Sequence, residues 1–234
     1  GGRSRIIGPS DCDDAKVALA LAKTFGAVVT PRPDGFDVRM PEAQGRRDRM
    51  TVDVNESGTS LRFVLPLLPF YCRTARVVGR GTLIGRPNQH LTESLRRAGL
   101  AISGDGPGES VPVSYHGGEL LGGKIEIDGS VSSQFISALM IALPRAPKET
   151  RLVLTGSSLV SQDYVVMTRQ ILARAGIRIV ERSAREFRIP GRQTFKGLKT
   201  FHVPSDWGLA AFFISAAAIV PSDIVLKGYF DDTL

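Results

Sequence analysis

An internal repeat constrains the fold of this chain more than any other feature of its sequence. Three segments begin with small hydroxylated or amide residues and continue as apolar helical patterns. They start at Ser57, Ser132 and Ser205, which are 75 and 73 residues apart. A short β-branched run ending at a glycine follows each segment (ARVVGRG, TRLVLTG and DIVLKG). This order predicts a helix, a turn and a strand in every copy.

A second amphipathic helix is expected after each of these strands. The first begins near Arg86 (RPNQHLTESLRRAG) and the second at Ser161 (SQDYVVMTRQILARAG). Both segments stop at Ala-Gly, a common helix C-terminus, and Pro87 suits the first helical position. The strands LAIS, IRIVE and FRIP follow, and a third helix of this kind is expected near the final DDTL.

The opening of the chain looks like the same unit without its first helix, because RIIG, SDCDDAKVALALAKTFGAVVT and FDVRM follow one another. The sequence therefore predicts an α/β (α+β) fold class built from helix–strand–helix–strand–strand units of about seventy residues that cover one another's apolar faces. Residues 41–54 and 104–118 fit this pattern least, and we expect them to form loops.

Composition narrows the possible functions without selecting one. The 234 residues are 42% hydrophobic and 23% charged, which excludes disordered and fibrous classes. A formal charge of +7 favours anionic partners. Two cysteines and three histidines are too few for a disulfide framework and offer little for a metal site.

The sequence also gives expectations about location and completeness. Residues 135–143 and 209–220 are the most apolar segments, and both are shorter than the roughly 20 residues of a membrane-spanning helix. With no export signal at the start, a reducing, cytoplasmic location is expected. The Gly-Gly start and DDTL end suggest an excised piece of a longer protein.

The starts of the repeated helices are candidate anion sites, because unpaired N–H groups there carry partial positive charge. Ser57, Ser132 or Ser205 alone signals only an N-cap. The run SVSSQF supplies more hydroxyl and amide groups than a cap requires, through Ser130, Ser132, Ser133 and Gln134. For this run we favour ligand binding over capping.

Four further side chains leave two interpretations each. Arg86 either binds a carboxylate or phosphate with its guanidinium fork or is solvated. Arg62, one turn into an apolar helix, either forms a buried ion pair or contacts an anion. Tyr164 packs in the core or covers a flat ligand. Asp206 caps the helix that follows it, which is the preferred interpretation, or acts in catalysis. Nucleotide, zinc-protease and esterase motifs are absent from the sequence.

Four strings, NESGTSLRF, GRPNQHL, IDGSVSSQFISAL and VSQDYVVMT, occur in an order and spacing that resembles the enolpyruvylshikimate phosphate synthase family. The likeness covers nearly the whole chain, and GSVSSQF is its most specific part. The resemblance implies transfer of the carboxyvinyl group of phosphoenolpyruvate to the 5-hydroxyl of shikimate 3-phosphate, with release of phosphate, in aromatic amino-acid biosynthesis. It implies no cofactor and no metal.

The resemblance also implies the roles of individual residues. Shikimate 3-phosphate would be bound by Ser132, Ser133, Gln134, Ser161 and Tyr164. Phosphoenolpyruvate would be bound by Gly58, Arg86 and Gln134, with Thr59 and Arg62 in support.

The chain departs from the commonest family pattern at three places. Glu56-Ser57 replaces Asn-Ala, so no ligand contact is assigned to Glu56. Gln162 and Asp163 replace Lys-Pro. The residues after Asp206 are apolar where small hydroxylated residues are usual, so Asp206 receives no catalytic role.

Members of this family have two similar domains, each of three units in a pseudo-threefold arrangement with helices inside and sheets outside. By resemblance, residues 1–204 are the inserted substrate-binding domain without its first helix, and residues 205–234 begin the partner domain. The catalytic acid and base groups are expected in the missing domain, so the chain alone should be inactive. We also hypothesise that residues 205–228 dock in the place of the missing helix and complete the first domain.

Other functions remain open. UDP-N-acetylglucosamine carboxyvinyltransferase shares the repeat, but its usual cysteine is absent from the loop GRGTLIG. A basic RNA-binding module and a structural domain that binds nothing are two further alternatives. The preferred prediction names two anionic substrates and the missing domain as partners, and neither nucleic acid nor membrane.

Overall fold

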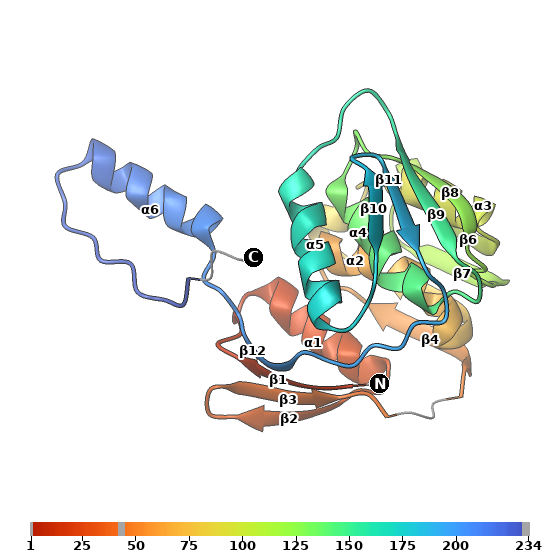
Figure 1. Cartoon of the computed structure of the whole chain (residues 1–234), viewed down its shortest axis with the longest axis horizontal. Helices are drawn as coiled ribbons and strands as arrows, with labels where there is room; N and C mark the ends of the chain where they lie inside the picture. The colour runs from red at the N-terminus through yellow and green to blue at the C-terminus, as the bar shows by residue number, and fades with distance from the viewer. Residues whose placement is uncertain (1, 42–44, 231–234) are drawn as a thin grey trace.

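The computed structural model describes residues 2–41 and 45–230, which form three four-stranded sheets around a set of helices (Figure 1). The sheets have the strand orders β12-β1-β3-β2, β4-β5-β7-β6 and β8-β9-β11-β10. Their strands are β1 (Arg3–Ile7), β2 (Val28–Arg32), β3 (Gly35–Arg39), β4 (Arg47–Asp53), β5 (Cys72–Val78), β6 (Leu100–Gly104), β7 (Val113–Gly118), β8 (Gly123–Asp128), β9 (Thr150–Thr155), β10 (Val180–Ser183), β11 (Glu186–Ile189) and β12 (Lys199–His202).

The three sheets share one topology, which confirms the predicted repeat. In each sheet an edge strand runs parallel to its neighbour, and the other two pairs are antiparallel. A helix connects the parallel strands of the second and third sheets, and a second helix follows the next strand of every unit. These helices are α1 (Asp13–Thr24), α2 (Gly58–Val64), α3 (Gln89–Arg97), α4 (Ser133–Ala142) and α5 (Gln162–Arg174), with short 3-10 turns at η1 (Leu65–Phe70), η2 (Gly81–Leu83), η3 (Pro107–Glu109) and η4 (Leu143–Arg145).

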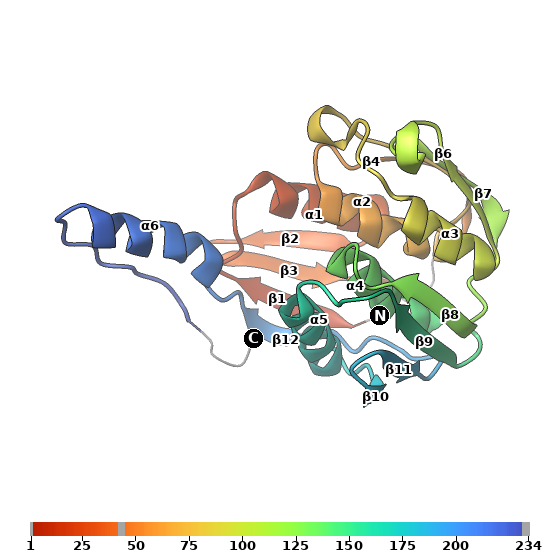
Figure 2. The same ribbon diagram turned by 90° about the horizontal axis from the view of Figure 1, so that it is seen from above.

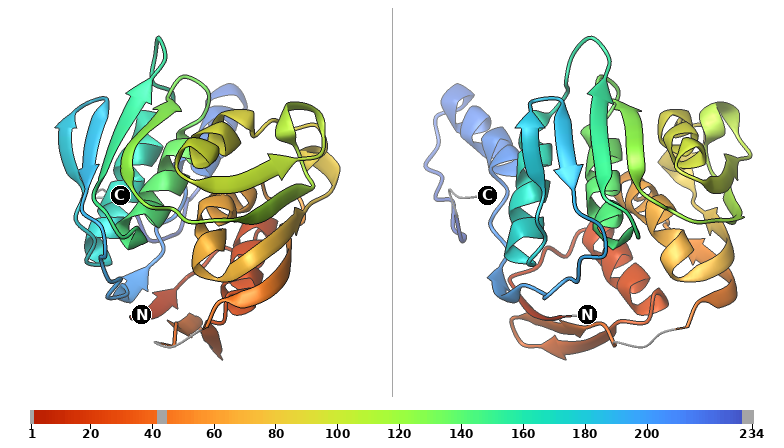
Figure 3. Two further views of the ribbon diagram at one scale, coloured as in Figure 1. Left: turned by 90° about the vertical axis from the view of Figure 1, so that its right-hand side faces the viewer. Right: turned by 45° about the vertical axis from the view of Figure 1, so that its right-hand side comes forward.

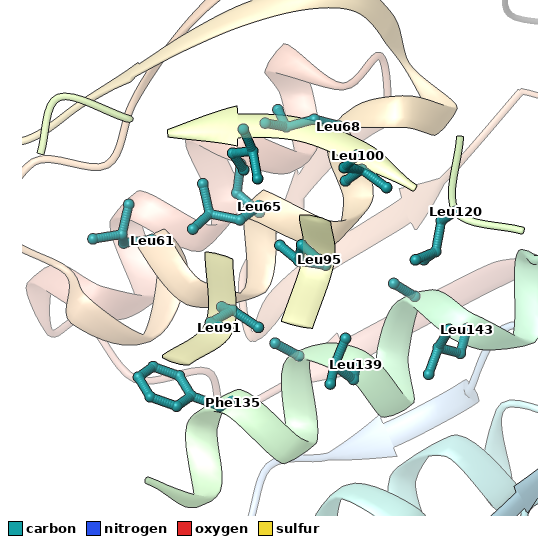
Figure 4. Packing of buried hydrophobic residues seen from close by; sticks show 14 of the residues in the cluster. Leu61, Leu65, Leu68, Leu91, Leu95, Leu100, Leu120, Phe135, Leu139 and Leu143 are labelled. Carbon is teal, nitrogen blue, oxygen red and sulfur yellow. The ribbon is translucent and has the colours of Figure 1, made fainter. Parts of the chain in front are cut away.

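The helices α2 and α4, which connect the parallel strands, are the most buried, and the sheets lie outside them (Figures 2 and 3). Leucines of α2, η1 and α3 meet Phe135 and Leu139 of α4 in the core (Figure 4). Such a core needs apolar residues on nearly every face of α4, which explains its weak amphipathic pattern. None of the helices in the described residues is long and apolar enough to cross a membrane.

Truncating Leu139 tests the importance of this core. Its side chain has no exposed surface, so Leu139→Ala should lower the free energy of unfolding by about 2–5 kcal/mol. Urea denaturation followed by circular dichroism measures the change. Leu121→Ala is the matched control, because Leu121 is 41% exposed and its truncation should cost less than about 1 kcal/mol. Equal losses for both variants would contradict the assignment of the core.

The edge strand of the first sheet comes from the far end of the chain. β12 pairs in parallel with β1, and Ile6 lies opposite Phe201. β12 therefore takes the place in the first sheet that β4 and β8 take in the other two. The sequence did not predict this strand, because four residues of mixed polarity carry no strand pattern of their own and the pairing is between distant segments.

The hypothesis that residues 205–228 dock and complete the domain is wrong for this structure. The helix α6 (Trp207–Ile219) projects from the rest of the molecule, with Ala210 as its buried residue (Figures 1 and 2). The segment after α6 returns to the base of that helix, where Ser205 N–H donates to the carbonyl of Tyr229. DIVLKG forms no strand. The helix predicted near DDTL lies outside the described residues.

Several predicted boundaries shift by a few residues. The Ala-Gly helix ends are confirmed, since Gly99 and Gly176 have φ of +106° and +84° directly after α3 and α5. α3 begins after Asn88, so Pro87 precedes the helix and does not open it. Residues 41–54 and 104–118 were expected to be loops but contribute β4 and β7, because pairing with β5 on either side outweighs their weak local pattern.

Candidate functional site

A cavity of about 750 Å³ lies where the N-terminal ends of α2, α4 and α5 approach one another. It is lined by residues from all four of the strings quoted above. Of the predicted site residues, Thr59, Arg86, Ser132, Ser133, Gln134, Ser161 and Tyr164 line it. The remaining two, Gly58 and Arg62, lie directly beside Arg86 and Gln134. The structure therefore brings all nine predicted residues together.

The three helix starts present different chemistry. Ser57 caps α2 by accepting a bond from the amide of Ser60 (3.2 Å), and Ser132 caps α4 by accepting one from Gln134 (3.3 Å). Ser161 precedes α5 in a left-handed conformation (φ 49°) and makes no capping bond. The predicted cap at Ser205 is wrong, because Asp206 caps α6 by accepting from the amide of Leu209 (3.1 Å). Ser161 thus keeps its hydroxyl available at the cavity rim.

Two guanidinium groups converge on the backbone of Gly58. A Cβ atom placed on Gly58 would lie 2.6 Å from Nη1 of Arg86 and 3.1 Å from Nη1 of Arg62. Among the described residues, no carboxylate lies within ion-pair distance of either arginine. The positive charges of Arg62 and Arg86 beside Gly58 are therefore not neutralised by an acidic side chain of the described residues. A side chain at position 58 would push the Arg86 guanidinium aside and crowd that of Arg62.

Arg62 is the more constrained of the two cations. It is only 4% exposed, and its Nε atom is buried without a hydrogen-bond partner. Burial, and next the nearby charge of Arg86, lower the pKa of Arg62 to about 10, so it remains charged at neutral pH. Of the two interpretations left open by the sequence, the ion pair is not formed in the described residues. A buried, unpaired cation is costly, and an anion bound at Gly58 would offset that cost.

Gln134 connects the two inner helices. Its Oε1 atom accepts a hydrogen bond from Arg62 Nη1, and its Nε2 atom donates to Oγ1 of Thr59 (3.0 Å). The guanidinium of Arg62 also lies 5.5 Å from the ring centre of Phe135. The two hydrogen bonds hold the Gln134 amide between Arg62 and Thr59.

Tyr164 stands at the rim, in the first turn of α5, with 60% of its surface exposed. It therefore does not pack in the core, which was one of its two interpretations. Below it, the hydroxyls of Ser137 and Thr168 lie 2.8 Å apart, and Thr168 also donates to the carbonyl of Tyr164. The wall beneath Tyr164 is therefore polar on this side of the cavity.

Two acidic side chains at the site were missed by the sequence reasoning. Ser57 Oγ donates to a carboxylate oxygen of Asp14, which links α1 to the start of α2. Glu56 accepts a hydrogen bond from the amide of Thr82 (3.2 Å). Asp14 belongs to none of the four strings, Glu56 was given no ligand contact, and the partners of both residues are distant in sequence. Within residues 2–41 and 45–230, no group of three or more His, Cys, Asp or Glu side chains could hold a metal ion.

Comparison with known proteins identifies the same family as the four sequence strings. The family model described as EPSP synthase (3-phosphoshikimate 1-carboxyvinyltransferase) matches residues 1–234. This chain belongs to the EPSP synthase family. The resemblance drawn from the sequence is therefore confirmed, and the predicted α/β fold class agrees with the structure.

Individual relatives match this chain over part of their own length. A 3-phosphoshikimate 1-carboxyvinyltransferase of Methanosarcina mazei is 33% identical over 220 residues, which cover 93% of this chain and 50% of the relative. That of Methanocella arvoryzae is 32% identical over 231 residues, with 98% and 54% covered. The chain therefore spans about half the length of the curated relatives it matches.

A solved structure supports the fold. The EPSP synthase of Acinetobacter baumannii superimposes with a TM-score of 0.73 over 93% of this chain and 48% of that one, at 23% sequence identity. The two chains thus share the three-sheet architecture. The match shows the fold of this chain, and the cavity at the ends of α2, α4 and α5 is its candidate functional site.

Proposed function

We propose that the chain forms one substrate-binding half of a 3-phosphoshikimate 1-carboxyvinyltransferase. The observation that carries this proposal is the convergence of Arg62 and Arg86 on Gly58, with no carboxylate of residues 2–41 or 45–230 paired to them, beside the hydroxyl groups at the starts of α4 and α5. Two adjacent anion sites of different character suit two anionic substrates. Family membership supplies the reaction: transfer of a carboxyvinyl group from phosphoenolpyruvate to shikimate 3-phosphate.

We assign each substrate to a different group of residues in the cavity. We assign phosphoenolpyruvate to Gly58 and the arginines, because a guanidinium fork matches a phosphate or carboxylate. We assign the phosphate of shikimate 3-phosphate to Ser132, Ser133 and Ser161, whose hydroxyl groups, like the amides of the α4 and α5 starts, can donate to phosphate oxygens. The Gln134 amide lies between these two groups of residues, and the exposed ring of Tyr164 would cover the shikimate ring.

This half lacks part of the required chemistry. The reaction needs a base for the attacking hydroxyl and a proton donor for the methylene carbon. We assign both to the partner domain, so this chain should bind substrate and not turn it over. The exposed apolar side chains of α6, such as Phe212 (74% exposed) and Phe213 (59%), support placing residues 205–234 in that partner domain.

Calorimetric titration with shikimate 3-phosphate, with and without phosphoenolpyruvate, tests the proposal. We expect saturable binding of shikimate 3-phosphate that weakens about tenfold in Ser133→Ala, because one hydrogen bond to a charged phosphate is lost. Ser130→Ala is the matched control, since the Ser130 hydroxyl donates to Asp128 (2.5 Å) and does not line the cavity. Tight RNA binding with steep salt dependence and no response to shikimate 3-phosphate would overturn the proposal.

A further inference from the structure

Glu56 occupies a position where an acidic side chain is unexpected. It lies two residues before Gly58, beside a site that carries two uncompensated guanidinium groups and is proposed to bind an anion. Its carboxylate does not pair with either arginine. Instead, Oε2 accepts a hydrogen bond from the backbone amide of Thr82, the second residue of the η2 turn.

The turn that Glu56 contacts also carries Arg86. Arg80 N–H donates to the carbonyl of Asn55 (2.8 Å), and Arg86 N–H donates to the carbonyl of Leu83 (3.1 Å). Leu83 is fully buried and anchors the middle of the turn. The η2 turn has no cap from its own preceding side chain, so the carboxylate of Glu56 fills that role from the neighbouring segment.

Gly81 leaves the space that this contact needs. It has φ of +55°, and a Cβ atom there would lie only 2.2 Å from Oε2 of Glu56. The carboxylate is therefore packed directly against the turn. Two links, one through Asn55 and one through Glu56, hold the segment before Gly58 against the segment that presents Arg86.

We propose that Glu56 is a positioning residue, which holds the 80–86 turn so that the guanidinium of Arg86 stands over Gly58. The inference rests on the proposed function, because it assigns the anion at Gly58 to phosphoenolpyruvate. Glu56 would thus act through its hydrogen bond to the backbone amide of Thr82 and would not contact the ligand.

Whether removing the Glu56 carboxylate strengthens or weakens phosphoenolpyruvate binding distinguishes a positioning role from a purely electrostatic one. A negative charge beside an anion site repels the ligand, so its removal alone should strengthen phosphoenolpyruvate binding. A positioning role predicts the opposite, because losing the contact with Thr82 frees the turn and Arg86 with it. Glu56→Gln distinguishes the two further, since it removes the charge and keeps an acceptor oxygen.

The experiment measures phosphoenolpyruvate binding by calorimetry on the full 234-residue chain saturated with shikimate 3-phosphate. Glu56→Ala should weaken binding about fivefold, the size expected for one exposed hydrogen bond to a carboxylate, and Glu56→Gln should restore most of it. In an Arg86→Ala background, Glu56→Ala should have no further effect. Glu93→Ala is the charge-matched control, because Glu93 lies on the exposed face of α3, where it pairs with Arg97 (3.9 Å).

Amide hydrogen exchange supplies a readout that needs no ligand. Glu56→Ala should accelerate exchange at Thr82 and Arg86 and leave Val77 in β5 unchanged. Tighter binding in both Glu56 variants, additivity with Arg86→Ala, or unchanged exchange at Thr82 and Arg86 would each overturn the positioning role. If the wild-type chain binds neither ligand, the proposed function fails, and the exchange rates still decide whether Glu56 holds the turn.

Discussion

Arg86→Ala is expected to weaken phosphoenolpyruvate binding about 100-fold while shikimate 3-phosphate binding stays within about twofold. The side chain supplies a charged fork to an anion over Gly58, and among the described residues no other partner competes for it. Arg86→Lys should recover only part of the loss, because an ammonium group cannot make two parallel hydrogen bonds to one anion. Titration calorimetry with each ligand measures both affinities.

Arg80→Ala controls for net charge in this experiment. Arg80 lies in the same loop and is exposed, and its structural contact is made by its backbone amide, which alanine retains. Its removal should change phosphoenolpyruvate binding by no more than about twofold, the effect of a screened surface charge. Equal losses in Arg80→Ala and Arg86→Ala would show that overall charge, and not the geometry at Gly58, attracts the ligand.

Gly58→Ala should weaken phosphoenolpyruvate binding at least about tenfold, for a different reason. The added methyl group would lie 2.6 Å from the Arg86 guanidinium and 3.1 Å from that of Arg62, so both cations must move. Folding should not suffer, because Gly58 is the first residue of α2 and alanine is a good helix former there.

The readouts for Gly58→Ala are ligand affinity by calorimetry and the thermal midpoint. Gly45→Ala is the control, since a Cβ at Gly45 meets no atom of the described residues within 4 Å. An unchanged affinity for phosphoenolpyruvate in Gly58→Ala, with a normal thermal midpoint, would place the anion elsewhere in the cavity.

The repeat explains why part of the site could be predicted from the sequence. Thr59 and Gln134 lie 75 residues apart, the same interval that separates Ser57 from Ser132, so they occupy equivalent positions on α2 and α4. Helices related by a repeat bring equivalent residues together across their shared axis. The hydrogen bond between Thr59 and Gln134 is thus a direct result of a spacing visible in the sequence.

The features that sequence did not predict depend on long-range contacts. β12 is a strand only because β1 offers it an open edge, and β4 forms beside β5 in the same way. α6 was correctly predicted as a helix from its apolar run, but nothing in that run indicates the direction in which the helix leaves the domain. Glu56 gave no signal because its partner is a backbone amide 26 residues away, which no side-chain motif records.

The pairing of β12 with β1 also affects the order in which the domain can form. The two strands register Ser4 with Lys199, so the first sheet cannot be completed until almost the entire domain has left the ribosome. The second and third sheets use strands from within residues 47–118 and 123–189, and they can assemble earlier. Closing so long a loop is slow, so we expect completion of the first sheet to be the late step of folding, with the open edge of β1 exposed to mispairing until then.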